Sequence, residues 1–382
     1  MRMLVLGGGL QGSACAYDLL QNPAVERVLL ADRLADASAP FLQHLERDPR
    51  LQRIVVDAEN ETQVRAAMQD VDACMNALPY YFNLPVARLA VEAGIHCCDL
   101  GGNTAIVFEQ IELDEQARAA GVSVIPDCGL APGMVNILAR ACIDALEQPD
   151  TVRIFVGGLP QDPQPPLNYQ IVYSLHGVLD YYTTQSWVLR AGEPYEVDAL
   201  SEIELVEFPP PVGTLEAFHT AGGLSTMPWT YRGLLRSMEY KTLRYPGHAD
   251  AMRTIRDLGL LATDPVVAAG QTVIPRDVFI ACAEPRLRRP ESHDLVALRV
   301  EARGRTAGER RTVSYDLLDY RDETTGITAM ERTTGFSLAI TGQLQVLGGV
   351  AGPGVRTPDE AVPADEYIRQ LSARGIEIRR TS

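Results

Sequence analysis

A glycine-rich loop near the N-terminus has the spacing needed to bind the phosphates of a dinucleotide. Gly7, Gly9 and Gly12 follow a short apolar run and precede a segment with helical periodicity. In this pattern the first glycine permits a tight turn, the second lets the backbone approach the pyrophosphate, and the third lets helix and strand pack closely. The free N–H groups at the helix start, around Leu10 and Gln11, then point at the phosphates.

An acidic residue completes this fingerprint and indicates which dinucleotide binds. Asp32 comes 20 residues after Gly12, at the end of the next predicted strand. A carboxylate there accepts hydrogen bonds from the ribose hydroxyls and repels a 2′-phosphate, which favours NAD over NADP. Arg33 follows directly, and its guanidinium could reach a 2′-phosphate. NAD is therefore the predicted cofactor, with NADP as the alternative.

Other predicted strand ends should lie in the same crevice, because ligands of open parallel sheets bind beyond the carboxyl ends of the strands. We predict that they contact the cofactor through Asp57, Asn76, Ala77, Leu78, Pro79 and Asp99. For Asp57 and Asp99, a helix cap or a turn is an equally good explanation.

The elements that position these residues alternate between strand and helix. Short aliphatic runs at 2–7, 27–32, 53–57, 73–77, 95–100 and 123–126 are separated by segments of helical period. This alternation predicts an α/β fold with a doubly wound parallel sheet, a Rossmann dinucleotide-binding domain. Helices predicted at 330–347 and 363–373 should return to this domain, which would make it discontinuous, with residues 1–131 and 330–382.

Residues 132–329 predict a second domain of a different kind. After a helix at 131–146, the pattern changes to longer alternating segments at 168–174, 192–196, 203–208 and 296–302. Long strands with little helix between them favour a largely antiparallel α+β domain.

Composition excludes several classes of function. The net charge of −16 argues against a nucleic-acid or anionic-membrane partner, because like charges repel. No apolar run is long enough to span a membrane, so we expect a cytoplasmic protein. The 7 cysteines lack CxxC or Cys/His zinc spacing, so we expect buried thiols and no metal.

Several further stretches resemble the saccharopine dehydrogenase family, and specifically its lysine 6-dehydrogenase branch. They cover most of the chain and are 126–133, 157–160, 165–169, 222–229, 239–248 and 325–336. The resemblance implies NAD(P)-linked oxidation of a small-molecule amino-acid substrate at a carbon–nitrogen bond by a homo-oligomer. It also implies that the second domain, residues 132–329, binds the substrate and forms a subunit interface. For lysine the product would be the semialdehyde, which cyclises to a piperideine carboxylate, together with NADH and ammonia.

This chemistry needs a base and a counter-charge for the far end of the substrate. Asp127 follows the sixth predicted strand and could orient the substrate ammonium, act as the base or cap the next helix. Arg244 suits bidentate carboxylate binding. In the block 239–248, Lys241 and His248 are further candidate bases, unless the block is a solvated helix face. Other predicted substrate contacts are Tyr240, Tyr169 and Thr226.

Lys241 stands out because it is the only lysine among 34 basic residues. A desolvated lysine can lose its proton, whereas arginine stays protonated. The sequence therefore predicts that Lys241 acts as a base that arginine cannot replace.

Two other functions compatible with the sequence remain open. A saccharopine dehydrogenase would bind a substrate with three carboxylates, for which Arg232, Arg236, Arg244 and Arg276 could supply the cations. A dinucleotide-binding protein without turnover is the third possibility. Ammonia release from lysine, glutamate release from saccharopine, or binding of NADH without reaction would separate the three.

Overall fold

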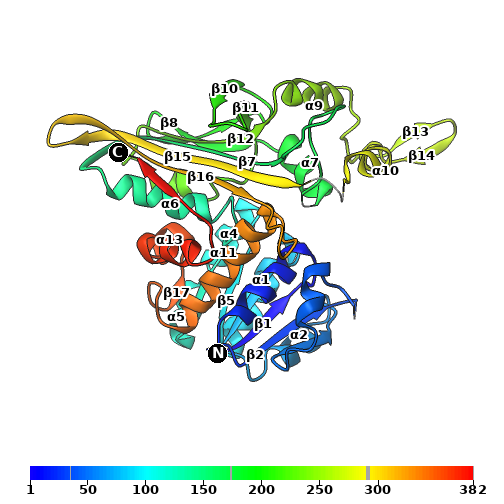
Figure 1. Cartoon of the computed structure of the whole chain (residues 1–382), viewed down its shortest axis with the longest axis vertical. Coiled ribbons are helices and arrows are strands. Elements are labelled where there is room, and N and C mark those ends of the chain that lie inside the picture. The colour runs from blue at the N-terminus through cyan, green and yellow to red at the C-terminus, as the bar shows by residue number, and fades with distance from the viewer. Residues whose placement is uncertain (35, 173, 290–292, 382) are drawn as a thin grey trace.

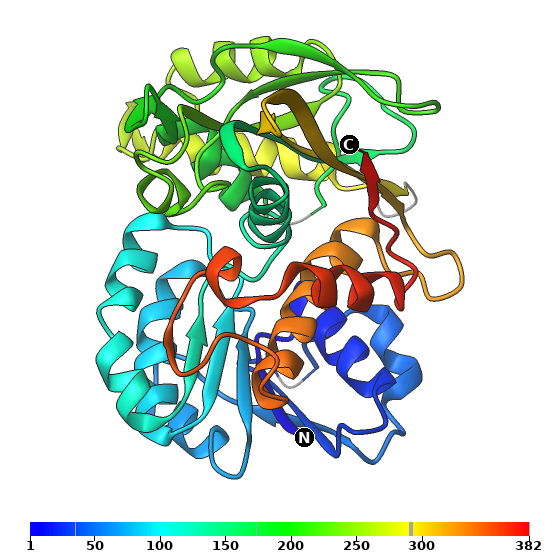
Figure 2. The same cartoon turned by 90° about the vertical axis from the view of Figure 1, so that its left-hand side faces the viewer.

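The computed structural model describes residues 1–34, 36–172, 174–289 and 293–381. Two domains lie one above the other, with the N-terminus at the far end of the lower domain (Figures 1 and 2). The lower domain is a seven-stranded parallel sheet in the order β17-β6-β5-β4-β1-β2-β3. The strands are β1 (Arg2–Leu6), β2 (Arg27–Asp32), β3 (Leu51–Val55), β4 (Ala73–Asn76), β5 (His96–Asp99), β6 (Ser123–Ile125) and β17 (Gly354–Val355). The predicted doubly wound sheet is confirmed.

Helices cover both faces of this sheet, which buries its apolar strands. One face packs against α1 (Leu10–Gln21) and α11 (Ala329–Val346). The other packs against α2 (Glu61–Ala67), α3 (Asn83–Ala93) and α5 (Asp114–Ala120), with α4 (Thr104–Ile111) beside α3. Because α11 and β17 belong to this domain, the chain returns to it after building the second domain, as the sequence predicts.

The upper domain is built on a nine-stranded sheet with the central order β10-β11-β12-β7-β15-β16-β18. All its pairings are antiparallel except that of β7 with β12. Its strands are β7 (Gln148–Pro160), β8 (Ser186–Arg190), β9 (Glu193–Val197), β10 (Glu204–Glu207), β11 (Thr214–His219), β12 (Ser237–Arg244), β15 (Asp294–Thr306), β16 (Glu309–Tyr320) and β18 (Arg379–Thr381). The predicted, largely antiparallel domain is confirmed.

Two local predictions differ from the structure. Residues 168–172 form a turn and irregular chain, not a strand, because the chain here follows the proline-rich stretch 159–167 and crosses from β7 to a helix. Residue 173 of the predicted strand lies outside the described residues. Residues 237–244 form β12, a largely buried strand in the middle of the sheet, so the solvated helix face considered for 239–248 is wrong. The chain end also departs from the predicted boundary, because β18 leaves the Rossmann domain and pairs with β16 (Figure 2).

The remaining elements join or flank the two sheets. They are α6 (Met134–Asp144), α7 (Leu175–Thr183), α8 (Met227–Thr230), α9 (His248–Asp257), α10 (Pro275–Leu287), α12 (Pro358–Ala361), α13 (Ala364–Ser372), the 3-10 turns at 40–45 and 80–82, and the hairpin of β13 (Val266–Ala268) with β14 (Gln271–Val273). The hairpin projects from the upper domain (Figure 1).

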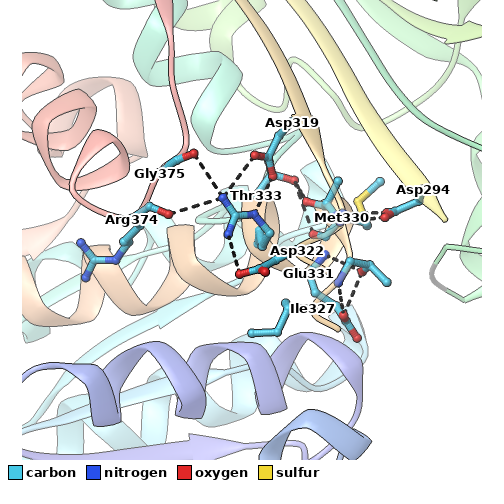
Figure 3. A network of polar contacts seen from close by, with 12 residues as sticks. Asp294, Asp319, Asp322, Ile327, Met330, Glu331, Thr333, Arg374 and Gly375 are labelled. Atoms are coloured by element: carbon cyan, nitrogen blue, oxygen red, sulfur yellow. Dashed lines mark hydrogen bonds and ion pairs between the residues drawn. The ribbon is translucent and has the colours of Figure 1, made fainter. Parts of the chain in front are cut away.

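The start of α11 connects the two domains through polar contacts (Figure 3). Asp294 of β15 accepts hydrogen bonds from the N–H groups of Ala329 and Met330, at 2.8 and 2.9 Å. One turn later the guanidinium of Arg332 pairs with Asp319 of β16 at 2.9 Å. These contacts satisfy the first N–H groups of α11 and fix the helix against the upper sheet.

Candidate active site

A cavity of about 680 Å³ lies between the glycine loop and the upper domain. From the Rossmann side it is lined by Gln11, by Ala77 to Tyr81 after β4, and by Gly101 and Gly102 after β5. From the upper domain it is lined by residues of β7, α7 and β12. The cavity therefore joins the predicted cofactor loop to the second domain.

The glycine loop has the geometry that a pyrophosphate requires. Gly7 has φ +96°, which favours glycine, and a Cβ on Gly12 would lie 1.8 Å from the carbonyl oxygen of Gly7. A Cβ on Gly9 would meet nothing within 4 Å, so the space beside this residue is open. The predicted roles of a turn, a close approach and tight packing each have a structural counterpart here.

The start of α1 also fits a phosphate ligand. Gly9 is its N-cap and supplies no side-chain acceptor, so no side chain caps the first helical N–H groups. The amide group of Gln11 is buried, lines the cavity, and has no hydrogen-bond partner among the described residues. Leu10 is 46% exposed and is absent from the cavity lining, so its contribution is limited to its backbone.

Asp32 lies beside the glycine loop. Its carboxylate accepts hydrogen bonds from the N–H groups of Gly8 and Leu34, at 2.7 and 2.9 Å. A carboxylate offers about four acceptor positions, so acceptor capacity remains for ribose hydroxyls. The neighbouring Arg33 is exposed. Asp57 accepts a hydrogen bond from the N–H of Glu59 at 3.0 Å, which is the contact of a turn former.

The polar strand ends are mostly buried beneath the cavity instead of lining it. The side chain of Asn76 donates to Asn83 at 2.9 Å, and Asn83 donates to Asp99 at 3.0 Å. Asp99 also accepts from Gln110 and from the N–H of Gly101, both at 2.7 Å. Burial raises the pKa of Asp99 to about 6. Direct cofactor contact by Asn76 and Asp99 is thus not supported, and their network holds the lining loops in place.

Asp127 is buried just below the cavity. It has φ +63°, and its carboxyl group accepts a hydrogen bond from the hydroxyl of Ser225, which joins the two domains. Burial raises the pKa of Asp127 to about 8, and the nearby carboxyls of Asp99 and Asp359 oppose its ionisation further. A carboxyl whose pKa lies near neutral pH can exchange a proton, so the base role of Asp127 stays a prediction, although Asp127 does not line the cavity.

The alternative role of Asp127 as a helix cap is wrong. The N–H at the start of α6 is that of Gly133, and it donates to the side chain of Asn136 at 2.6 Å. Asp127 packs against the loop after β5, since a Cβ on Gly101 would lie 1.9 Å from its Oδ1.

Strand β12 presents alternate side chains to the cavity. Tyr240, Thr242 and Arg244 line it, whereas Lys241 does not. Lys241 is 4% exposed, and its ammonium group donates to Glu204 Oε1 at 2.6 Å and to the carbonyl of Glu202 at 2.7 Å. The structure therefore argues against Lys241 as the base, because the pleat points it to the opposite face of the sheet.

We accordingly expect Lys241→Arg to keep kcat within a few-fold of the wild type. Arginine preserves the positive charge that faces Glu204. Because the site is tightly packed, the larger side chain should lower the melting temperature instead. Steady-state kinetics and thermal unfolding of the variant check this. A hundredfold fall in kcat with an unchanged melting temperature would restore Lys241 as the base.

Two more predicted residues lie behind the cavity wall. His248 is 2% exposed and Tyr169 is 2% exposed, and neither lines the cavity. Thr226 is also buried outside the lining, at the start of α8. Of the predicted substrate contacts, the structure brings only Arg244 and Tyr240 to the cavity.

Sequence reasoning missed the residues that α7 contributes. His176, Asp180 and Tyr181 all line the cavity, and His176 is exposed to solvent. Asp180 pairs with Arg276 at 2.5 Å. The spacing of His176 and Asp180, four residues apart, was a usable signal, because i and i+4 share one helix face.

One group of potential metal ligands lies elsewhere. Glu202, His219 and Glu239 place ligand atoms within 4.8 Å of one another on the side of Lys241. The two carboxylates already pair with Arg190 and Arg153, at 2.5 and 2.6 Å. The prediction that the protein uses no metal stays a prediction. No helix in the described parts of the chain has the length and apolar character to cross a membrane.

The fold and the glycine loop are those of a Rossmann-type dinucleotide-binding protein. Residues 3–125 match the saccharopine dehydrogenase NADP binding domain, and residues 129–376 match the saccharopine dehydrogenase C-terminal domain. The chain belongs to the saccharopine dehydrogenase family, which confirms the resemblance seen in the sequence.

Curated relatives include two yeast saccharopine dehydrogenases described as NADP(+)-dependent and L-glutamate-forming. The enzyme of Schizosaccharomyces pombe is 24% identical over 269 residues, 68% of this chain and 58% of that enzyme. The enzyme of Saccharomyces cerevisiae is 24% identical over 279 residues, 69% of this chain and 59% of that enzyme. The matched region thus spans less than two thirds of these relatives.

Solved structures extend the similarity of fold to the whole chain. The apo saccharopine dehydrogenase of Saccharomyces cerevisiae gives a TM-score of 0.81 at 19% identity, covering 100% of this chain and 99% of that one. A homospermidine synthase from Legionella pneumophila in complex with NAD gives a TM-score of 0.71 at 11% identity, covering 100% of this chain and 91% of that one.

Proposed function

We propose that this protein is a pyridine-nucleotide-dependent dehydrogenase that oxidises the amine-bearing carbon of an amino acid. The observation that carries the proposal is the position of Arg244, which lines a cavity whose Rossmann side includes Gln11, next to Gly12 of the glycine loop. A guanidinium there can bind a substrate carboxylate while the amine end extends toward the nicotinamide. The aliphatic part of the substrate would pack against Tyr181 and Tyr240.

His176 is the proposed base. It lines the cavity, and imidazole is the side chain whose ordinary pKa lies nearest neutral pH. Its exposure lets a proton taken from the substrate ammonium or from the attacking water pass to solvent. The bound dinucleotide would supply the hydride acceptor.

Two substrates are candidates, and different observations favour them. The curated relatives favour saccharopine, and they support it better than lysine. The cavity favours a substrate with one carboxylate, such as L-lysine, because Arg244 is the only arginine or lysine among its described lining residues. Arg232 and Arg236 pair with Glu193 and Asp150 outside the lining.

A product assay tests the function and separates the substrates. The protein is incubated with NAD or NADP and either L-lysine or saccharopine, and reduced coenzyme, ammonia and glutamate are measured. Ammonia from lysine supports the first substrate, and glutamate from saccharopine supports the second. If neither L-lysine nor saccharopine leads to reduction of NAD or NADP, the proposed function is contradicted.

For the coenzyme we expect kcat/KM to favour NAD over NADP. The carboxylate of Asp32 lies beside the glycine loop, where the 2′-phosphate of NADP would meet its negative charge. Measuring both coenzymes with the wild type and with Asp32→Ser checks this, since the variant should lose the preference. A wild-type preference for NADP would instead indicate that Arg33 binds the phosphate.

A further inference from the structure

Arg244 is held by a chain of hydrogen bonds behind the cavity wall. Its side chain is 3% exposed, and Nη1 donates to the carbonyl groups of Gly158 and Leu243, at 3.4 and 2.9 Å. Nε donates to the hydroxyl of Tyr182 at 3.3 Å. Tyr182 lies on α7, so the helix that carries His176 also supports the guanidinium.

The chain continues from Tyr182 to His248 at the start of α9. The Tyr182 hydroxyl lies 3.0 Å from Nε2 of His248, and Nδ1 of His248 lies 3.2 Å from the carbonyl oxygen of Leu167. Since the hydroxyl accepts a hydrogen bond from Arg244, its own proton is available for Nε2. The Leu167 carbonyl can only accept, so Nδ1 carries the imidazole proton.

The surroundings of His248 keep its ring in place and neutral, so that Nε2 continues to accept the hydrogen bond from the Tyr182 hydroxyl. Its ring is stacked on Phe218, with centroids 6.3 Å apart, and meets the edge of Tyr169 at 5.5 Å. Burial and the charge of Arg244 lower the pKa of His248 to about 3, so the imidazole stays neutral. The Tyr169 ring also lies under the guanidinium, 4.9 Å from its carbon.

We propose that Tyr182 and His248 are positioning residues that orient the Arg244 guanidinium for the substrate carboxylate. The inference rests on the proposed function of Arg244. It also assigns His248 a role different from the catalytic base predicted from the sequence. A guanidinium fixed in one orientation stays aimed at the carboxylate, whereas a mobile one loses part of that geometry.

The first experiment uses Tyr182→Phe, which removes one hydroxyl and keeps the ring. With whichever of L-lysine and saccharopine the wild type oxidises, KM should rise about tenfold or more while kcat changes only a few-fold. Tyr245→Phe is the matched control, because its hydroxyl donates to the Pro160 carbonyl at 3.0 Å one residue from Arg244 but outside the cavity lining. It should leave KM unchanged.

The same measurement has outcomes that overturn the inference. When Arg244→Gln is already present, Tyr182→Phe should cause no further rise in KM, because the two residues act as one unit. His248→Gln, which keeps an acceptor for the hydroxyl, should retain more affinity than His248→Leu. An unchanged KM in Tyr182→Phe, or additive effects with Arg244→Gln, contradicts the positioning role.

A second experiment does not depend on turnover. Nitrogen NMR of the ¹⁵N-histidine-labelled protein should show His248 neutral and protonated on Nδ1 from about pH 5 to 8. Comparison with the His248→Gln spectrum assigns the signal. A proton on Nε2, or a charged ring, overturns the inference. If neither amino acid is oxidised but this tautomer is present, the proposed function fails while the hydrogen-bond chain stands.

Discussion

Replacing His176 with glutamine is expected to lower kcat by about 10²- to 10⁴-fold, the usual cost of losing a general base. Glutamine is close in size and forms hydrogen bonds, but it cannot take a proton. Binding of the reduced coenzyme should be unchanged, because His176 comes from the upper domain and not from the glycine loop. The measurement is kcat, KM and fluorescence titration of the reduced coenzyme.

The split between kcat and KM distinguishes a base from a merely structural histidine. His176→Gln should lower kcat while KM and the melting temperature change little, because glutamine keeps much of the size and hydrogen-bonding capacity of the side chain. His293→Gln is the matched control, because His293 pairs with Glu323 outside the cavity lining. A variant with kcat within a few-fold of wild type would remove His176 from the mechanism.

The second large effect is expected for Gly9→Val, which should weaken coenzyme binding roughly a hundredfold or more while the fold survives. A Cβ on Gly9 meets nothing within 4 Å, so the protein itself has room for the side chain. The same open space is where the pyrophosphate should approach the backbone. Coenzyme titration and thermal unfolding together measure the two consequences.

Gly352→Val is the control for this substitution. Gly352 also has nothing within 4 Å of an added Cβ, and it lies outside the cavity lining. It should leave coenzyme affinity unchanged, which separates an effect of valine in general from an effect at the loop. Unchanged affinity in a folded Gly9→Val protein would show that this loop does not hold the pyrophosphate.

The coenzyme side of the site could be predicted because its signals are local. The predicted roles of Gly7, Gly9 and Gly12 depend on backbone conformation and close approach, and that of Asp32 on its carboxylate. All four residues belong to one strand–turn–helix–strand unit, whose spacing can be recognised directly in the sequence. Alternating strands and helices predicted the sheet for the same reason. The strand 237–244 was harder to predict from the sequence, because its burial depends on neighbouring strands from other parts of the chain.

Sequence alone determined the Rossmann domain, its return through α11, the coenzyme loop and the family. Tertiary structure decided which side chains reach the cavity. Strand β12 alternates faces, so its place in the sheet selects Tyr240 and Arg244 and excludes Lys241. Burial, which no local pattern specifies, raises the pKa of Asp127 and makes His248 a neutral support. Packing of α7 against the crevice brings in His176. These outcomes depend on contacts between segments far apart in the chain, and a local pattern of residue types does not show which segments will meet.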